Sequence, residues 1–498
     1  MSETTICHPS ADQFFKLSAE NTLIPVYREI IADLETPVSV YAKVFSGSYS
    51  CLLESVEGGA SLARYSFIAG DPFIIFQAYG QRLEITEDGH KTVKRGNFVT
   101  VLRALLAKYK VAPIPGLPRF FGGAVGYVGY DAARLFEKLP NEPQDELGLP
   151  DVCLIFPESV IVFDHYTSRL KIIVNARIFN NPEAAYRQAV EKIEQLTLAI
   201  RNSCYTLFDQ YRQRSQNGGT LPVMGNMTRH EYSHKVEKIK SHIYAGDILQ
   251  AVLSQRFETQ IDANPFDVYR MLRTLNPSPY MYYLDFGEVR IAGSSPEMLV
   301  RLDNGVVETR PIAGTRPRGK TPVLDKNLEE DLLHDAKERA EHVMLVDLGR
   351  NDLGRVSQYG SIEIPTFMTC ERYSHVMHLV SEVKGILRKD KDALDAFLAC
   401  FPAGTVSGAP KIRAMEIIDE LEPTKRGPYA GAVGYFSFTG NMDTCITIRT
   451  IIFARGKAYA QAGAGIVADS QPEMEYDETV HKVRILLEAL KIAGEGVT

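Results

Sequence analysis

The chain has 498 residues, of which 45% are hydrophobic and 23% charged, as is ordinary for globular proteins. A formal net charge of −7 argues against nucleic acid or an anionic membrane as the main partner. No apolar run reaches the roughly 18 residues of a membrane helix, and no signal-peptide pattern opens the chain. The seven cysteines lack any Cys-x-x-Cys spacing, which is typical of reduced thiols, so we expect a cytoplasmic protein.

The pattern of polar and apolar residues predicts two units. The clearest seam is residues 213–226, a polar stretch with Gly218–Gly219 and Pro222 and no periodicity. We therefore predict an N-terminal region of residues 1–212, a linker of residues 213–226 and a C-terminal region of residues 227–498.

The expected elements alternate irregularly between strand and helix. In the first unit we expect strands at residues 37–45, 49–55, 63–70, 73–79, 82–88, 159–165 and 169–179, and a long helix from Pro182. In the second unit we expect helices starting at Thr228 and Asn264, strands at residues 250–261, 280–286, 289–294, 297–303 and 306–312, and helices at residues 328–346, 391–400, 408–421 and 472–492. Strands without strict strand–helix alternation favour the α+β class with antiparallel sheets.

Two segments repeat the sequence Gly-Ala-Val-Gly-Tyr, at residues 121–130 and 429–438. One explanation is chance resemblance between glycine-rich strands. The alternative is that equivalent strands from the two halves meet in one core, where glycine allows close backbone approach.

Two Glu-x-x-Glu pairs are the first candidate site. Glu338 and Glu341 form one pair, Glu475 and Glu478 the other, and each lies in a stretch with helical spacing. Residues three apart share a helix face, so each pair directs two carboxylates to one side. A solvated helix face explains either pair alone, whereas four converging carboxylates would favour a hard cation such as Mg²⁺.

Other candidates are polar groups in apolar or glycine-rich surroundings. The turn Gly463-Ala464-Gly465 lets backbone N–H groups approach an anion, although a plain structural turn explains it as well. Thr405 and Ser407 precede a helix, and Ser407 is an alternative cap for that helix. Three lone polar residues complete the set: Arg449, which must pair with a carboxylate of protein or ligand, and His378 and Glu297, for which a structural role is the default.

Eight ordered motifs carry a family resemblance: GSSPEMLVR, TRPIAGTRPRG, VDLGRNDLGRV, GTVSGAPK, YAGAVGYF, TIRT, QAGAGIVADS and PEMEYDET. In this order they resemble the chorismate-utilising enzymes, and most closely their anthranilate synthase component I group, over about residues 50–490. The resemblance implies an α+β sandwich of mostly antiparallel sheets with outer helices. It makes residues 1–212 regulatory or structural and residues 227–498 the catalytic region.

The resemblance also implies an activity: conversion of chorismate and ammonia to anthranilate and pyruvate, the first step of tryptophan biosynthesis. Glu341 and Glu478 would bind Mg²⁺, with Glu338 and Glu475 as outer partners. Glu297 would be the general acid, with a raised pKa, and His378 a second catalytic residue. The substrate would contact Gly314, Thr315, Thr405, Tyr429, Arg449, Gly463, Ala464, Gly465 and Lys482.

Two positions separate related activities. Ala313 stands where aminodeoxychorismate synthases carry a nucleophilic lysine, and Gln250 where isochorismate and salicylate synthases carry a lysine that activates water. Both favour anthranilate synthase. The alternatives are aminodeoxychorismate synthase component I and a catalytically silent tryptophan sensor, which would be expected to lose Glu297 or the acidic pairs.

An inhibitor site and a partner are implied as well. Residues 52–55 and 276–281 resemble the elements that bind tryptophan, through Glu54, Ser55, Pro279, Tyr280 and Met281. No cysteine lies in a Gly-x-Cys-x-Gly elbow, so we expect a separate glutamine amidotransferase subunit to supply ammonia, in a heterotetramer.

Overall fold

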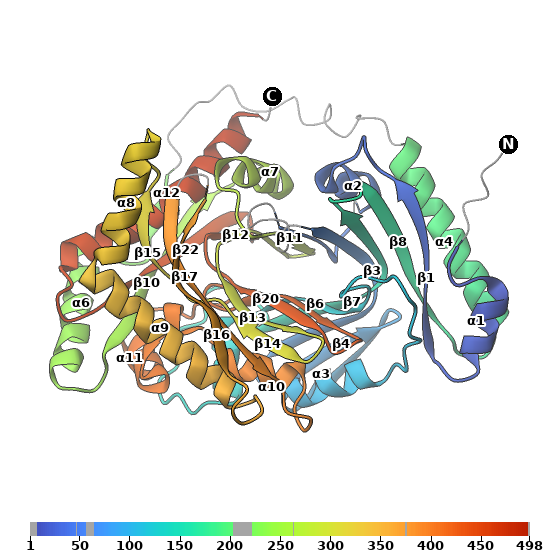
Figure 1. Ribbon diagram of the computed structural model, residues 1–498, viewed down its shortest axis with the longest axis horizontal. Coiled ribbons are helices and arrows are strands. Elements are labelled where there is room, and N and C mark those ends of the chain that lie inside the picture. Colours follow the sequence, from blue (N-terminus) through green and yellow to red (C-terminus); the bar gives the residue numbers. More distant parts are fainter. Residues whose placement is uncertain are drawn as a thin grey trace.

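The computed structural model describes residues 7–45, 47–55, 64–202, 222–261, 263–373 and 376–496. All pairs of named strands in these ranges are antiparallel. Helices lie outside the sheets (Figure 1). The expected α+β sandwich is confirmed. None of the helices in these ranges combines the length and apolarity that a bilayer crossing requires.

Two long strands, β3 (Tyr65–Tyr79) and β7 (Val152–Asp164), pair with each other at the centre of the strand network. The N-terminal strands flank them in the order β1 (Leu23–Ile31), β8 (Arg169–Arg177), β7, β3, β4 (Arg82–Glu87) and β5 (His90–Arg95). The helices of this part are α1 (Ala11–Ser18), α2 (Pro37–Val44), α3 (Phe98–Ala107) and α4 (Pro182–Asn202). Helices α1, α2 and α4 share one apolar core with β1 and β8.

One sheet extends from β3 into the second half of the chain. Its order is β2 (Ser50–Glu54), β11 (Tyr280–Phe286), β12 (Val289–Ser295), β21 (Thr450–Ala454), β22 (Lys457–Ile466) and β10 (Gln250–Gln260), with β9 (Met224–Gly225) and β18 (Gly408–Ala409) on β10. Its helices are α6 (Arg229–Tyr244), α7 (Pro265–Leu275) and α12 (Pro472–Glu495).

A second sheet extends from β7. Its order is β6 (Gly123–Val128), β19 (Ala432–Ser437), β20 (Met442–Ile446), β13 (Met298–Asp303), β14 (Val306–Thr309) and β17 (Val376–Ile386), with β15 (Ile312–Pro317) and β16 (Glu363–Arg372) on β17. Its helices are α8 (Pro322–His334), α9 (Ala336–Gly354) and α10 (Ala393–Cys400), and the short turn η1 (Tyr130–Leu135) follows β6. Helix α11 (Lys411–Leu421) and the short turn η2 (Gly404–Val406) pack against β10 and β18 of the first sheet. Tyr282 and Ile452 of the first sheet share one buried core with Tyr435 of the second.

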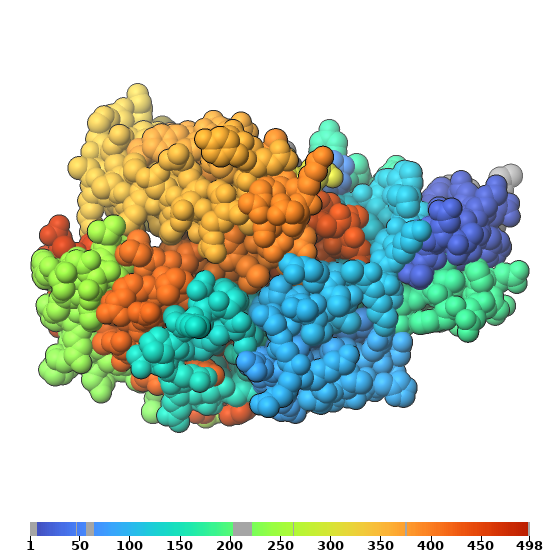
Figure 2. Space-filling view, turned by 90° about the horizontal axis from the view of Figure 1, so that it is seen from below, coloured from blue at the N-terminus to red at the C-terminus, as the bar shows by residue number. Residues whose placement is uncertain are grey.

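The repeated Gly-Ala-Val-Gly-Tyr segments are neighbouring strands. In β6 and β19, Gly126 lies directly opposite Gly434. A Cβ at Gly434 would lie 2.1 Å from the carbonyl oxygen of Asp443, and one at Gly126 would lie 2.2 Å from that of Cys153. Only glycine permits this approach. The prediction that the two halves meet in one core is confirmed, and Figure 2 shows teal segments of the first half directly against orange segments of the second.

The strand expected at residues 37–45 is wrong, because this segment is helix α2. Its β-branched residues indicate a strand locally, but Thr36 forms a capping box with Ser39 and Pro37 occupies the first turn. Val40 and Tyr41 then lie on the buried face, so a local start signal and tertiary packing prevail over residue propensity.

Two further boundaries differ. The helix expected at residues 328–346 is two helices, because Asp335 ends α8 and caps α9. The strands expected at residues 63–70 and 73–79 form the single strand β3, with a register shift near Pro72. Residues 213–221 of the expected linker lie outside the described residues.

Candidate functional site

The two acidic pairs lie in the first two turns of two helices. Glu338 and Glu341 belong to α9, whose start is fixed by the Asp335 carboxylate, which accepts hydrogen bonds from the backbone N–H groups of Lys337 and Glu338 at 2.9 and 3.1 Å. Glu475 and Glu478 belong to α12, which begins at Pro472. The helical spacing expected for both pairs is therefore observed.

The pairs come within electrostatic reach of each other. Burial raises the pKa of Glu341, and the neighbouring carboxylates of Glu338 and Glu478 raise it further. Burial and Glu478 likewise raise the pKa of Glu475. Since Glu341 and Glu478 come from two helices that are distant in the chain, α9 (Ala336–Gly354) and α12 (Pro472–Glu495), only the tertiary fold brings this charge together.

These carboxylates fit a hydrated divalent cation. Within the described ranges, no three His, Cys, Asp or Glu side chains already form a cluster that could hold a metal. Mg²⁺ does not require one, because it keeps several waters and takes one or two carboxylates besides an anionic substrate. A cation would also relieve the mutual repulsion that raises the pKa of Glu341. Glu338, already 3.5 Å from Arg316, fits an outer position.

Glu297 lies between β12 and β13 and is 9% exposed. Burial raises the pKa of its carboxyl to about 8, while the Thr405 hydroxyl and the Lys482 ammonium act in the opposite direction. The Thr405 Oγ1 is itself buried, and among the described residues the group it acts on is the Glu297 carboxyl, whose pKa it lowers. The carboxyl is therefore protonated at neutral pH, as general-acid chemistry requires.

Lys482 connects Glu297 to the second acidic pair. Its Nζ lies 2.6 Å from Glu478 and donates a hydrogen bond of 2.9 Å to the carbonyl of Gly463. The turn expected at Gly463-Ala464-Gly465 is wrong, because these residues lie within strand β22 and pair in register with β10. The intervening Ala464 is fully buried in the core beneath α6 and α11. Ala464 can therefore face a ligand only through its backbone.

Arg449 is a cation that forms no ion pair in the described part of the chain. It lies partly buried between β20 and β21 in the left-handed conformation, with φ of 51°. Burial lowers its pKa, whereas the charges of Glu478 and Tyr429 raise it. Strained residues of this kind concentrate at functional sites, and a ligand carboxylate is the partner that its chemistry lacks.

His378 lies on β17 beside Gly314 and Thr315 of β15. Its Nδ1 is 2.8 Å from the Gly314 carbonyl oxygen and 3.2 Å from the Thr315 hydroxyl. Burial lowers the pKa of His378, so the ring is neutral near pH 7. With the hydrogen assigned to Nδ1 by the carbonyl contact, Nε2 retains a lone pair that can accept a proton. A Cβ at Gly314 would lie 3.3 Å from Glu338, which places His378 near the first acidic pair.

The two positions that separate related activities also lie at this site. Ala313 is buried on β15, directly before Gly314. Gln250 is buried on β10, and a Cβ at Gly465 would lie 2.5 Å from its side-chain nitrogen. Neither side chain is a nucleophile or a base.

A second pocket lies elsewhere on the same sheets. The predicted inhibitor residues all line it: Glu54, Ser55, Pro279, Tyr280 and Met281. They meet because β2 pairs with β11, with Glu54 opposite Met281. The Ser55 hydroxyl is buried without a hydrogen-bond partner in the described part of the chain, and so is available to a ligand. The Glu54 carboxylate, by contrast, accepts hydrogen bonds from Tyr269 and from Arg273, the latter at 3.1 Å.

Sequence reasoning missed the charged wall of this pocket. Arg301 donates hydrogen bonds to Asp443 at 3.0 Å and to the Tyr280 hydroxyl at 3.2 Å, and Arg119 also lines the pocket. These residues come from three distant segments and lie in no shared motif.

Sequence reasoning also missed a buried pair, Arg426 and Glu422, behind the first site. Its only local signal is the spacing of four residues just before the YAGAVGYF motif. Ser407, the alternative helix cap, does not cap α11, since its hydroxyl donates to the Ala403 carbonyl.

Comparison with known proteins agrees with this geometry. The model of the chorismate binding enzyme family matches residues 60–488. Anthranilate synthase component 1 of Acetivibrio thermocellus is 51% identical, covering 98% of this chain and 99% of that protein, and the protein of the same name from Aquifex aeolicus is 46% identical, covering 98% of each. The crystal structure of anthranilate synthase component I from Streptococcus pneumoniae superposes with a TM-score of 0.77 at 40% identity, covering 92% of this chain and 99% of that one. The chain is thus a member of the chorismate-binding enzyme family, and within it groups with the anthranilate synthase component 1 proteins.

Proposed function

We propose that the chain converts chorismate and ammonia to anthranilate and pyruvate, with Mg²⁺ as cofactor. The observation that carries this proposal is the 51% identity, along nearly the whole chain, to a protein named anthranilate synthase component 1. The site geometry supports it, because Glu478 acts electrostatically on both Glu341 and Arg449 and pairs with Lys482, which in turn acts on the protonated Glu297.

In the first half-reaction, ammonia adds to ring C2 and the C4 hydroxyl leaves. Glu297 donates its proton to that hydroxyl, so the leaving group is water rather than hydroxide. Its pKa of about 8 keeps the proton in place at neutral pH. Arg449 and Tyr429 bind the enolpyruvyl carboxylate, and Thr405 orients Glu297.

In the second half-reaction, C2 loses its proton and the C3–O bond breaks, which makes the ring aromatic. The enolate that leaves takes up a proton at its methylene carbon and becomes pyruvate. The neutral His378 would accept the proton from C2 through Nε2, a role that its Nδ1 contact with the Gly314 carbonyl supports. Gly314 and Thr315 form the adjoining wall, and the backbone of Gly463, Ala464 and Gly465 borders the substrate on the β22 side.

Glu341 and Glu478 would hold the metal, with Glu338 and Glu475 acting through water. Mg²⁺ when bound would neutralise the ring carboxylate of chorismate and act as a Lewis acid there. Lys482 would balance the remaining negative charge, since it already pairs with Glu478.

A glutamine amidotransferase subunit would supply ammonia in the cell, in a heterotetramer. The name component 1 carried by the relatives supports a second component. Tryptophan would inhibit from the pocket of Ser55, Tyr280 and Met281. That pocket is one strand from the reaction site, because Met281 lies opposite Ser294, whose N–H donates to the Arg449 carbonyl at 3.1 Å. An inhibitor that favours one arrangement of this strand pair would alter the position of Arg449.

The test is a product assay on the purified chain. With chorismate, Mg²⁺ and ammonium at mildly alkaline pH, fluorescent anthranilate and an equal amount of pyruvate should form. Glutamine in place of ammonium should give no product. An amino-deoxy ring that keeps its enolpyruvyl side chain would contradict the proposal in favour of the aminodeoxychorismate reaction, and chorismate left unchanged would contradict both.

A further inference from the structure

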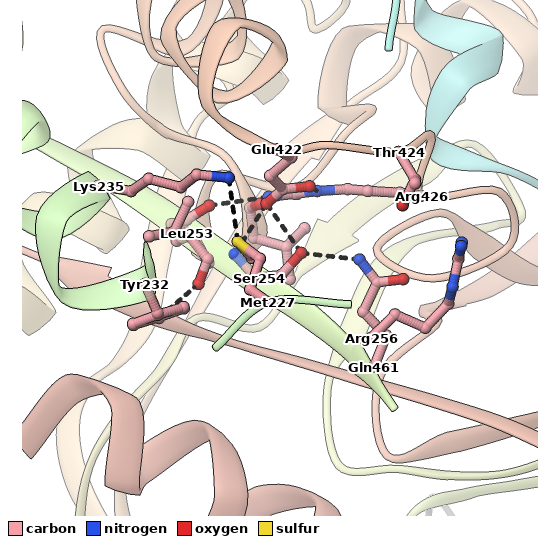
Figure 3. A network of polar contacts seen from close by, with 12 residues as sticks. Met227, Tyr232, Lys235, Leu253, Ser254, Arg256, Glu422, Thr424, Arg426 and Gln461 are labelled. Atoms are coloured by element: carbon pink, nitrogen blue, oxygen red, sulfur yellow. Dashed lines mark hydrogen bonds and ion pairs between the residues drawn. The ribbon is translucent and has the colours of Figure 1, made fainter. Parts of the chain in front are cut away.

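A buried ion pair lies behind the wall of the candidate site (Figure 3). Arg426 is 2% exposed and Glu422 is 5% exposed. The guanidinium donates to the two Glu422 oxygens, from Nε at 2.8 Å and from Nη2 at 2.6 Å. No step of the proposed reaction uses either residue.

The other contacts of the Arg426 guanidinium reach two walls of the site. Nη1 donates to the Val406 carbonyl at 2.7 Å, and Val406 directly follows Thr405. Nη2 donates to the Val252 carbonyl at 2.8 Å, and Val252 lies opposite Gly465 across β10 and β22. One planar group thus fixes the turn η2 and the strand pair β10–β22, which contains Gly463 and Gly465.

The flat faces of Arg426 contact a third wall. The guanidinium carbon lies 4.4 Å from the Tyr130 ring centre and 5.7 Å from the Tyr429 ring centre. Burial raises the pKa of Tyr429, and the positive charge of Arg426 opposes that rise. The ring that would face the substrate is therefore held by the same side chain as Thr405 and β10.

Glu422 extends the connection toward Lys482. Its Oε1 accepts hydrogen bonds from the backbone N–H and from the hydroxyl of Ser254, both at 2.8 Å (Figure 3). Ser254 lies opposite Gly463, whose carbonyl accepts the Lys482 hydrogen bond. Gln461 donates to the same Ser254 hydroxyl at 2.8 Å.

We propose that Arg426, held by Glu422, is a positioning residue that sets Thr405, Tyr429 and the Gly463–Gly465 segment of β22 in mutual register for catalysis. This inference rests on the proposed function. Stability alone is a poor reason for such a pair, since apolar replacements of buried ion pairs are often neutral or stabilising. A guanidinium directs its donors in fixed, coplanar directions, whereas the ammonium of lysine has no such directions. Geometry is therefore what this residue type supplies here.

The experiment compares Arg426→Lys with Arg256→Lys. Arg256 is another buried arginine, 4% exposed, and lies on β10, the strand whose Val252 carbonyl accepts a hydrogen bond from Arg426. Arg256 pairs with Glu146 and donates to the carbonyl of Lys425, the residue before Arg426, at 3.2 Å, but makes no hydrogen bond to Val252, Val406 or Glu422. The assays are ammonium-dependent kcat, KM for chorismate, thermal midpoint and the pH dependence of kcat. If the wild-type enzyme makes no anthranilate, the proposed function is wrong, and the positioning role of Arg426 is overturned with it.

Arg426→Lys should lower kcat by about 100-fold with a smaller change in KM, because misplacement by about 1 Å of groups that position a reaction has that effect. Arg256→Lys should stay within about twofold. Thr405 and Lys482 act on the Glu297 carboxyl, and Asp352 and Cys400 line the same pocket. The Thr405 contact keeps the pKa of Glu297 lower than burial alone would. Displacing Thr405 should therefore move the alkaline fall of kcat to higher pH.

Thr405→Val should produce the same displacement of the alkaline limb, and the double variant Arg426→Lys/Thr405→Val should move it no further. A folded Arg426→Lys enzyme with unchanged kcat and pH limb would overturn the proposal. The proposal would also be overturned if Arg256→Lys lost as much kcat and thermal midpoint as Arg426→Lys, because Arg426 would then have a merely structural role. If Arg426→Lys does not fold, Glu422→Gln is measured instead. A lower kcat whose alkaline fall is displaced to higher pH supports the proposal, and wild-type kinetics overturn it.

Discussion

Replacement of Glu297 by glutamine should lower activity and raise stability together. The amide keeps the shape of the side chain but cannot give up a proton. General-acid catalysis by a positioned group contributes about 10²- to 10⁴-fold, so kcat should fall by a factor in that range. When the wild-type rate is measured at a constant concentration of free ammonia, it should fall above about pH 8, where Glu297 loses its proton.

The effect on stability follows from the same pKa. The difference between the usual value of 4.5 and a value of about 8 corresponds to about 5 kcal/mol, at about 1.4 kcal/mol per pH unit. Between these values the unfolded chain loses the proton while the folded chain keeps it, so the free energy of unfolding of the wild type decreases as pH rises. Below pH 4.5 both states are protonated, and above pH 8 both are ionised.

The assay is urea unfolding of the wild type and Glu297→Gln in parallel, followed by far-ultraviolet circular dichroism at pH 5, 7 and 9. The variant should gain on the wild type from pH 5 to pH 9, by up to about 5 kcal/mol, since other titrating groups cancel in the difference. Glu488→Gln, on the exposed face of α12, is the control and should show no such trend. A stability difference independent of pH would refute the raised pKa, and unchanged kcat would refute the role as acid.

Three further outcomes test other parts of the reasoning. Glu341→Gln should weaken the apparent Mg²⁺ affinity in the chorismate assay by at least about tenfold, and a wild-type Mg²⁺ titration would remove Glu341 from the metal site. Ser55→Phe should abolish tryptophan binding while sparing kcat. Because the chain contains no tryptophan, the fluorescence of the added amino acid reports binding directly. Retained binding would show that the inhibitor pocket lies elsewhere. Gly434→Ala should reduce the free energy of unfolding by about 1–3 kcal/mol or more, because its Cβ would meet a backbone oxygen, whereas Gly47→Ala, with open space around it, should be nearly neutral. Equal stability of the two alanine variants would contradict the close packing of β6 and β19.

Prediction from the sequence worked best where a local pattern fixes the structure. The capping box at Thr228 starts helix α6, and the asparagine cap at Asn264 starts helix α7, as expected. It failed at residues 37–45, where β-branched residues and a helix cap compete and packing of Val40 and Tyr41 decides. The break at Asp335 was missed for a related reason, since a cap inside a helical pattern is recognised only when the chain changes direction.

The sequence by itself determined which residue types are present and their local spacing: the acidic pairs on single helix faces, the glycine strands and the ordered motifs of the family. Only the tertiary structure decided that α9 and α12 present their carboxylates to each other, that Arg449 has no ion-pair partner among the described residues, and that Glu297 keeps its proton near neutral pH. The reason is physical. Hydrogen bonds and side-chain periodicity act over a few residues, whereas desolvation and charge depend on which distant segments the fold places around a group.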